Sequence, residues 1–122
     1  MVKIAIADDS TPIRLLLRRR LEAAGYRVVE AADGEELIEV IETRCEGRVD
    51  LALVDWMMPR LAGAEATAVI RDKWPGMPVI GFTAGMPAVE GAAMPDSFFS
   101  KPFDFDYLFE TIRELTGEPP RP

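Results

Sequence analysis

The stretch Leu51–Asp55 has the sequence Leu-Ala-Leu-Val-Asp, in which four apolar residues are followed directly by an acid. An apolar run this short, followed by a loop that contains Pro59, is typical of a buried strand rather than a helix. The same reasoning predicts strands at Lys3–Ala7, Tyr26–Ala31, Pro78–Phe82 and Ser97–Ser100.

Helical patterns lie between these strands. Apolar residues recur at helical spacing between Thr11 and Gly25, and they are Ile13, Leu16, Leu17, Leu21 and Ala24. Further helices are predicted over 35–45, over 63–74, and from Asp104 or Asp106 onward, the last with Leu108, Ile112 and Leu115 on its inner face. Strands that alternate with helices in this way predict an α/β fold, with helices on both faces of a parallel sheet.

Length and composition exclude several classes of protein. The 122 residues suit one domain, predicted over 1–117 with a flexible tail over 118–122. Cys45 is the single cysteine and there is no histidine, which excludes an internal disulfide, histidine-dependent triads and histidine metal sites. The net charge of −7 argues against direct nucleic-acid binding. No run resembles a signal peptide or a membrane-spanning segment, so we expect a cytoplasmic protein with no membrane insertion.

Polar residues stand where four of the predicted strands end: Asp8 and Asp9, then Asp55, Thr83 and Lys101. Ligands bind at this edge of a parallel sheet, so these residues are expected to face one crevice. Three crowded carboxylates repel one another and suit a hard divalent cation such as Mg²⁺. Asp55 could then act as a nucleophile towards phosphorus, with Thr83 and Lys101 contacting phosphoryl oxygens. Each residue alone is more simply a cap or a turn former, and their shared location favours a site.

At this point the sequence resembles the response-regulator receiver family, over about residues 2 to 116. The motifs that carry the resemblance are Asp8-Asp9, Asp55-Trp56-Met57-Met58-Pro59 with Gly63, Thr83-Ala84 and Lys101-Pro102-Phe103. The resemblance implies a doubly wound, flavodoxin-like sheet of five parallel strands in the order 2-1-3-4-5.

The resemblance also implies roles. Asp55 would accept a phosphoryl group from a sensor histidine kinase or a histidine phosphotransfer protein. Asp9 and Asp55 would bind Mg²⁺ directly, Asp8 directly or through a water, and the backbone carbonyl of Met57 would be a further ligand. The only chemistry expected is the chain's own phosphorylation and its self-dephosphorylation. The self-dephosphorylation is expected to be slow, because neither Met57 nor Gly85 could orient an attacking water.

The resemblance further implies that Thr83, Lys101 and Phe98 change position when the switch is turned on. Thr83 would move towards the phosphoryl group, Lys101 would pair with it, and Phe98 would rotate inward. The interval from Thr83 to Lys101 is shorter than usual by about one helical turn. We therefore predict a short or irregular fourth helix, which would alter the family's usual output surface. Output would pass to a downstream protein target or onward in a phosphorelay.

Three alternatives compete with this interpretation. A phosphatase with an aspartate nucleophile would carry an acid where Met57 stands, and a flavin-binding electron carrier would need a neutral phosphate loop in place of Asp8-Asp9. A degenerate receiver, acting as a phosphorylation-independent binding module, is the remaining alternative. Trp56 is expected to be partly exposed, and Cys45 packed near a helix end. Arg18–Arg20 is expected to be a solvated face, or alternatively a kinase-docking edge.

Overall fold

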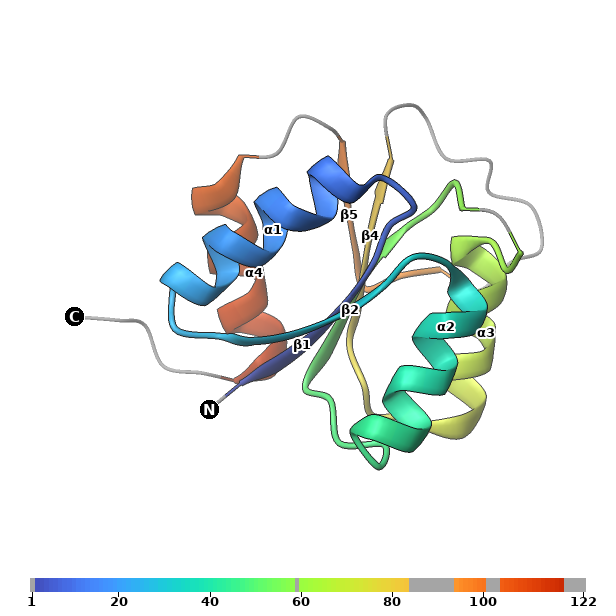
Figure 1. Ribbon diagram of the computed structural model, residues 1–122. Helices are drawn as coiled ribbons and strands as arrows, with labels where there is room; N and C mark the ends of the chain where they lie inside the picture. Colours follow the sequence, from blue (N-terminus) through green and yellow to red (C-terminus); the bar gives the residue numbers. More distant parts are fainter. Residues whose placement is uncertain (1, 59, 84–93, 101–103, 118–122) are drawn as a thin grey trace.

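The computed structural model describes residues 2–58, 60–83, 94–100 and 104–117, and its centre is one parallel sheet of five strands (Figure 1). The strands are β1 (Lys3–Ala7), β2 (Arg27–Ala31), β3 (Leu51–Asp55), β4 (Val79–Thr83) and β5 (Ser97–Ser100). Their order is β2-β1-β3-β4-β5, which confirms the predicted flavodoxin-like arrangement. The order reverses between β1 and β3, and this reversal is where such sheets bind ligands, at the carboxyl ends of the strands.

Helices cover both faces of the sheet. They are α1 (Thr11–Ala23), α2 (Gly34–Glu39) with its π-helical continuation η1 (Val40–Arg44), α3 (Gly63–Lys73) and α4 (Phe105–Thr116). Helices α1 and α4 lie on one face, and α2 and α3 lie on the other (Figure 1). The helix predicted over 35–45 is therefore present, but its second half is a π-helix. The predicted short fourth helix belongs to the stretch 85–96, of which 85–93 lies outside the described residues, as does the predicted tail over 118–122.

Side-chain caps explain where three of the helices begin. The Ser10 hydroxyl accepts a hydrogen bond from the backbone N–H of Ile13, and Pro12 lies in the first turn of α1. Asp33 caps α2 in the same way, and Asp104 caps α4, which decides between the two predicted starts of that helix. None of the helices in the described ranges has both the length and the apolarity that crossing a bilayer requires.

The two faces of the sheet bury side chains of different size, because alternate residues of a strand point to opposite faces. Towards α1 and α4 point large residues: Ile4, Ile6, Leu51, Leu53, Ile80 and Phe82. Towards α2 and α3 point smaller ones: Ala5, Ala7, Ala52, Val54 and Val79. Each fully buried leucine or isoleucine contributes roughly 1.5–3 kcal/mol relative to an exposed one, so the strand side chains under α1 and α4 contribute more than the smaller ones on the opposite face.

Most predicted core positions of the helices are buried or half-buried, the half-buried ones including Ile13, Ala24 and Leu115, but Leu16 is exposed. Leu17 and Leu21 of α1 are buried against the sheet, whereas Leu16 is 48% exposed. Leu16 fits the helical spacing, but neighbouring residues of a helix point about 100° apart and only Leu17 faces the strands. In α4, Leu108 and Ile112 are buried as predicted. Cys45 is buried and free where η1 ends, which confirms its predicted packing role.

Candidate functional site

Three carboxylates meet at the carboxyl ends of the two central strands. Asp8 directly follows β1 and Asp55 ends β3, and these strands are neighbours in the sheet. One carboxylate oxygen from each of Asp8, Asp9 and Asp55 lies within 4.8 Å of the others. Asp8 is fully buried and Asp55 is 4% exposed, while Asp9 is exposed. The cluster is therefore a pocket with two buried acids and a third at its mouth.

Backbone groups hold the two buried acids in place. The N–H of Ser10 donates to Oδ1 of Asp8 at 2.8 Å, and the N–H of Met57 donates to Oδ1 of Asp55 at 3.1 Å. In both cases the donor is two residues after the acid, which is the geometry of a local turn that aspartate favours. The turn at the end of each strand thus orients the carboxylate at that strand end.

The donor set fits a hard divalent cation. Carboxylate oxygens are the ligands that Mg²⁺ prefers, and oxygens bound to one Mg²⁺ in an octahedron lie roughly 3–4.2 Å apart. The separations in the cluster, all within 4.8 Å, approach that range. Three carboxylates at this distance also repel one another, and burial of two of them strengthens the repulsion. A bound cation would offset both effects.

Thr83 reaches the same end of the sheet from β4. Strand β4 pairs with β3 so that Phe82 lies opposite Asp55, and Thr83 is the next residue along. Thr83 is buried, and Ser100 of β5 lies opposite it. The structure therefore brings Asp8, Asp9 and Asp55 together and places Thr83 at the same edge of the sheet. Lys101 lies outside the described residues.

Met57 stands beside the acids, with its side chain 74% exposed. Its backbone N–H contacts Asp55, as described above. The predicted role of its carbonyl as a metal ligand stays a prediction. The exposed thioether has no hydrogen-bond donor with which to hold a water molecule over the acids.

The prediction that Trp56 is partly exposed is wrong, because its side chain is only 6% exposed. The indole lies over Gly81 of β4 and reaches Phe98 of β5, with the ring centroids 5.0 Å apart in an edge-to-face arrangement. A Cβ atom at Gly81 would lie 2.9 Å from the indole, and one at Gly63 would lie 2.6 Å from the Cα of Trp56. Two glycines therefore make the space in which Trp56 is buried.

Phe98, the predicted switch aromatic, lies in β5 opposite Gly81 and is half-buried. Its ring contacts Trp56, the residue that directly follows Asp55. No sequence signal pointed to this contact, since nothing local to Trp56 or Phe98 indicates that a glycine stands between them.

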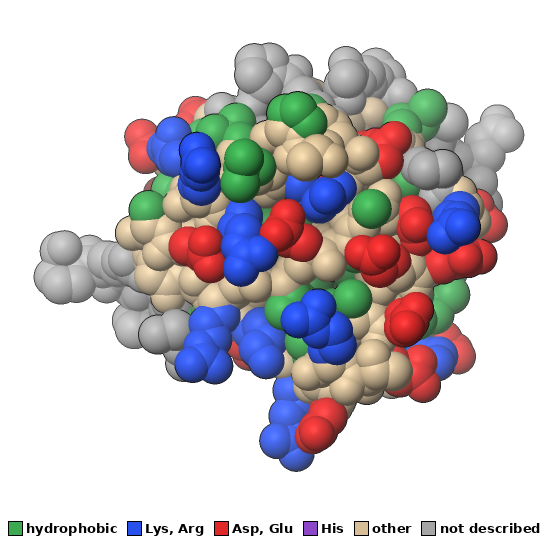
Figure 2. Space-filling view, in the orientation of Figure 1, with side chains coloured by type: hydrophobic (Ala, Val, Ile, Leu, Met, Phe, Trp, Pro, Cys, Tyr) green, Lys and Arg blue, Asp and Glu red, His purple; other side chains and the backbone are tan. Residues whose placement is uncertain are grey.

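Arg19 and Arg20 are exposed and Arg18 is half-buried, so the run Arg18–Arg20 is largely the solvated face that was predicted, although two of its members make specific contacts. Arg18 forms ion pairs with Glu22 and Glu30, and the hydrogen bond to Glu30, followed by that to Glu22, raises the pKa of Arg18. The guanidinium of Arg20 lies 4.2 Å from the ring centroid of Phe105, which links α1 to α4. Figure 2 shows basic and acidic side chains interspersed on the face of the molecule that it views.

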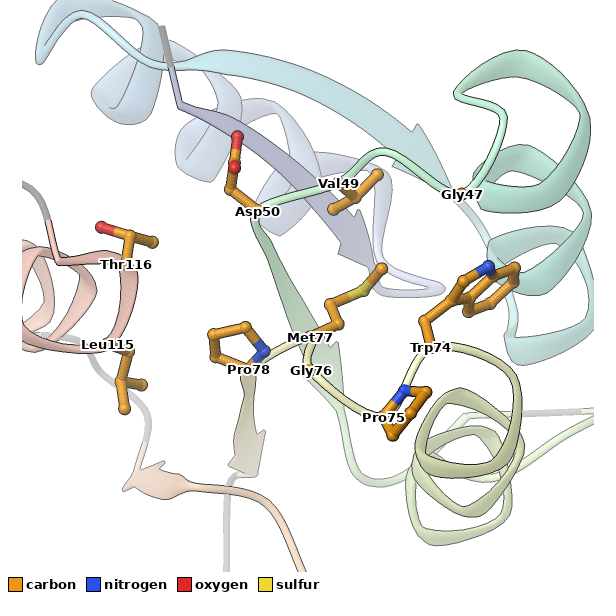
Figure 3. A pocket seen from close by; sticks show the side chains of 10 residues that line it. All are labelled: Gly47, Val49, Asp50, Trp74, Pro75, Gly76, Met77, Pro78, Leu115 and Thr116. Atoms are coloured by element: carbon orange, nitrogen blue, oxygen red, sulfur yellow. The ribbon is translucent and has the colours of Figure 1, made fainter.

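A hollow of about 430 Å³ lies at the other end of the sheet (Figure 3). Its lining comes from the segments that precede β3 and β4 and from the end of α4, and includes Val49, Trp74, Met77 and Leu115. Because these segments meet the amino ends of the strands, the hollow is remote from the acidic cluster. The candidate chemistry and this hollow are therefore separate features.

Comparison with known proteins identifies the family of this chain. Residues 4–113 match the family model described as the response regulator receiver domain. The CAI-1 autoinducer sensor kinase/phosphatase CqsS of Vibrio cholerae is 35% identical over 118 residues, which cover 90% of this chain and 17% of that protein. The response regulator MprA of Mycolicibacterium vanbaalenii is 34% identical over 118 residues, which cover 93% of this chain and 50% of that protein. The chain thus spans half or less of the length of these relatives.

A solved structure agrees with these matches. The response regulator TrrA of Thermotoga maritima, in complex with Mg²⁺-BeF, is 31% identical and superposes with a TM-score of 0.82. The match covers 94% of this chain and 99% of that one. The sheet order, the acids at the ends of its central strands and these likenesses lead to one conclusion: the chain belongs to the response regulator receiver domain family.

Proposed function

We propose that the chain is a signalling switch that is turned on when Asp55 accepts a phosphoryl group beside a bound Mg²⁺. The observation that carries this proposal is the acidic cluster, in which the buried Asp55 shares a pocket with Asp8 and Asp9. A buried carboxylate crowded by two others lowers the stability of the fold, so a purely structural role does not explain it. Its position at the switch point of the sheet suits ligand binding. The likeness to a receiver solved with Mg²⁺-BeF supports the same reading.

In the proposed reaction, an oxygen of Asp55 attacks the phosphorus of a phosphohistidine on a sensor kinase or phosphotransfer protein. The new bond joins that oxygen to phosphorus, and the phosphorus–nitrogen bond breaks with its electron pair going to the imidazole. The Met57 N–H holds Oδ1 of Asp55 and so orients the carboxylate for the attack. Mg²⁺, held by Asp9 and Asp55 with Asp8 and the Met57 carbonyl, would neutralise charge on the phosphoryl oxygens.

The proposed response uses Thr83, Lys101 and Phe98. Thr83 stands one residue beyond the partner of Asp55 in β4, and its hydroxyl would donate a hydrogen bond to a phosphoryl oxygen. Lys101 would bind another oxygen as a point charge. Phe98 would turn inward as Thr83 moves, and that rotation would change its edge-to-face contact with Trp56. The state of Asp55 would thus be transmitted to β5, where a downstream protein could detect it.

Resetting of the switch would be slow. Water would attack the phosphorus, the Asp55 carboxylate would leave, and inorganic phosphate would be released. The exposed Met57 side chain cannot orient that water, so no side chain at this position would accelerate the hydrolysis. We expect a phosphoryl lifetime well beyond seconds, and a half-life of a few seconds would contradict this part of the proposal.

The test follows the fluorescence of Trp56 in a Trp74→Phe background, first with Mg²⁺ and then with added beryllofluoride as a phosphoryl mimic. We expect a saturable change at each step, since the indole contacts Phe98 and directly follows Asp55. Asp55→Asn should abolish the beryllofluoride step. Asp50→Asn is the matched control, because Asp50 directly precedes the strand that Asp55 ends.

A second readout is the mass of the protein after incubation with phosphoramidate, a small donor with a phosphorus–nitrogen bond. The wild type and Asp50→Asn should gain one phosphoryl group, and Asp55→Asn should gain none. If the folded wild type responds to neither Mg²⁺ nor beryllofluoride and gains no mass, the proposal fails. The chain would then act as a phosphorylation-independent binding module.

A further inference from the structure

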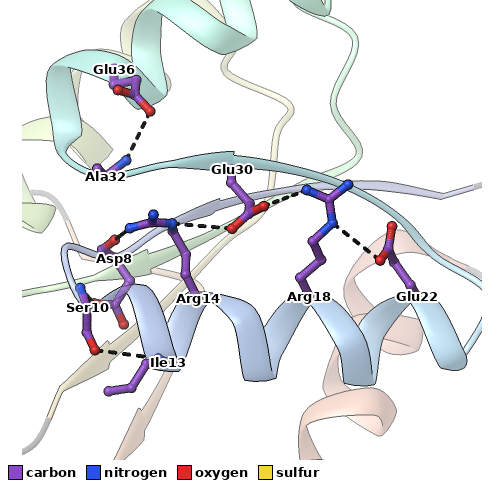
Figure 4. Close-up of polar contacts among 9 residues, drawn as sticks. All are labelled: Asp8, Ser10, Ile13, Arg14, Arg18, Glu22, Glu30, Ala32 and Glu36. Carbon is purple, nitrogen blue, oxygen red and sulfur yellow. Dashed lines mark hydrogen bonds and ion pairs between the residues drawn. The ribbon is translucent and has the colours of Figure 1, made fainter.

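A single guanidinium links α1 to the ends of β1 and β2 (Figure 4). Nη1 of Arg14 donates to the backbone carbonyl of Asp8 at 2.8 Å, and Nε of Arg14 donates to Oε1 of Glu30 at 3.3 Å. The Arg14 side chain is only 18% exposed, so these contacts are largely shielded from water. The sequence indicated no role for Arg14, which looked like one more surface residue of α1.

The contact with Arg14 completes the fixation of Asp8. The N–H of Asp8 donates to the carbonyl of Ala31 at 3.1 Å, and Oδ1 accepts from the N–H of Ser10. Arg14 adds a charged donor on the carbonyl oxygen, and such charge-assisted hydrogen bonds are roughly twice as strong as neutral ones. The backbone on both sides of the Asp8 Cα is therefore held, and the direction of its carboxylate follows from that backbone.

Glu30 in turn holds Arg14. Its Oε1 accepts from Arg14 and its Oε2 accepts from Arg18, and Arg18 also pairs with Glu22 one turn further along α1 (Figure 4). A planar guanidinium fixed at Nε has little freedom at Nη1, so Glu30 fixes the direction from which Arg14 reaches Asp8. The network thus runs from the α1–β2 surface to the backbone of the most buried acid in the cluster.

We infer that Arg14 is a positioning residue for the Mg²⁺ site: through its contact with the Asp8 carbonyl it sets the geometry of the acidic cluster. This inference rests on the proposed function, because it assumes that the cluster binds Mg²⁺. Groups that orient the ligands of a metal commonly contribute about tenfold or more to its affinity.

The positioning role of Arg14 and its charge predict opposite changes in Mg²⁺ affinity when the residue is replaced. As a cation near a cation site, Arg14 repels Mg²⁺, so on charge alone its removal would tighten binding. If Arg14 acts by holding Asp8, its removal weakens binding. Lysine keeps the charge, but it has no second nitrogen in a fixed fork with which to contact Glu30 and the Asp8 carbonyl together.

The experiment compares Arg14→Met, Arg14→Lys and, as control, Arg19→Met, a substitution of an exposed arginine on the same helix. The Mg²⁺ dissociation constant is measured by Trp56 fluorescence in the Trp74→Phe background, and unfolding by urea is measured without Mg²⁺. We expect both Arg14 variants to bind Mg²⁺ about tenfold more weakly. Arg19→Met should bind as the wild type does.

Two results would overturn the inference: unchanged affinity in both folded Arg14 variants, or tighter binding by Arg14→Met with unchanged binding by Arg14→Lys. Should the Arg14 variants not fold, Glu30→Gln gives a second test, since it keeps the side-chain size and weakens the hold on Nε. It should weaken Mg²⁺ binding by about tenfold, the lower end of outer-shell effects, and wild-type affinity in Glu30→Gln would then overturn the inference. A wild type that shows no Mg²⁺ response would instead mean that the proposed function itself is wrong.

Discussion

At the carboxyl ends of β1 and β3, two buried carboxylates lie close to a third. At the amino ends of the same strands, a carboxylate instead stabilises the fold. There, Oδ2 of the exposed Asp50 accepts the backbone N–H of Lys3 at 2.8 Å, which ties β3 to β1 where both begin. The neighbouring loops carry Trp74, Met77 and Pro78, which line the hollow of Figure 3. The same kind of side chain thus lies in opposite surroundings at the two ends of one strand.

The difference separates residues that stabilise the fold from residues that reduce its stability. Carboxylates buried beside one another repel, and this repulsion raises the free energy of the folded state. The hydrogen bond from Lys3 to Asp50 introduces no such repulsion. Substitutions at the carboxyl end should therefore change ligand binding, and substitutions at the amino end should change only stability. Three experiments test this difference between the two ends, in decreasing order of the change that each should produce.

Mg²⁺ should stabilise the protein only through the carboxyl end. At a Mg²⁺ concentration of 100 times the dissociation constant, binding to the folded state alone adds about 2.7 kcal/mol to the free energy of unfolding. Urea unfolding with and without Mg²⁺ should show this gain in the wild type and in Asp50→Asn, and little of it in Asp55→Asn. An equal gain in Asp55→Asn would mean that Mg²⁺ acts somewhere else on the molecule.

The glycines at the two ends should respond differently to an added methyl group. A Cβ at Gly63 would lie 2.6 Å from the Cα of Trp56 and 2.8 Å from the carbonyl oxygen of Asp55. These are backbone atoms next to the site, so Gly63→Ala should cost about 1–3 kcal/mol and also weaken Mg²⁺ binding. Gly76, before β4, has nothing within 4 Å of that position, and Gly76→Ala should leave the protein unchanged or slightly more stable.

Thermal unfolding of Gly63→Ala and Gly76→Ala at the same Mg²⁺ concentration measures the change in stability that each substitution causes. A similar loss of stability in Gly63→Ala and Gly76→Ala would contradict the comparison, because it would show that the carboxyl end is no more tightly constrained than the amino end.

Neutralising one exposed acid at each end should move stability in opposite directions. Without Mg²⁺, Asp9→Asn removes a charge that repels two buried carboxylates and should raise the free energy of unfolding by about 0.5–1 kcal/mol. Asp50→Asn weakens a hydrogen bond at the surface and should lower it by about 0.5 kcal/mol. Chemical denaturation in a chelating buffer resolves the two signs. A loss of stability in Asp9→Asn would show that repulsion in the cluster is already relieved by other contacts.

The fold was predictable because its signals are local. Runs such as Leu51–Asp55 are too short and too apolar for anything but buried strands, and helical spacing between them leaves few topologies. The acids at the strand ends followed from the same argument, since carboxyl ends of parallel strands share an edge. Sequence pattern alone was therefore enough to place Asp8, Asp9 and Asp55 together.

What the sequence missed depends on contacts between distant segments. Trp56 was expected to be partly exposed, and only the pairing of β4 with β5 shows that Gly81 lies between it and Phe98. The hydrogen bond from Arg14 to the Asp8 carbonyl depends both on the turn after β1 and on the direction in which α1 leaves that turn. Leu16 and Leu17 are equally apolar, and the rotation of α1 on the sheet decides which of them is buried.

The burial of one indole against two glycines also has a consequence for how this sequence can change over generations. A larger residue at position 81 would collide with the Trp56 indole, so Gly81 cannot be replaced while that indole is present. At position 63 the collision is with backbone atoms of Asp55 and Trp56, which no substitution of Trp56 would remove. Loss of the indole would therefore have to precede any change at Gly81, and it would leave β5 without the ring that Phe98 packs against. Trp56 and Gly81 thus restrict the order in which their own mutations can accumulate, and Gly63 is restricted by the backbone beside the acceptor aspartate.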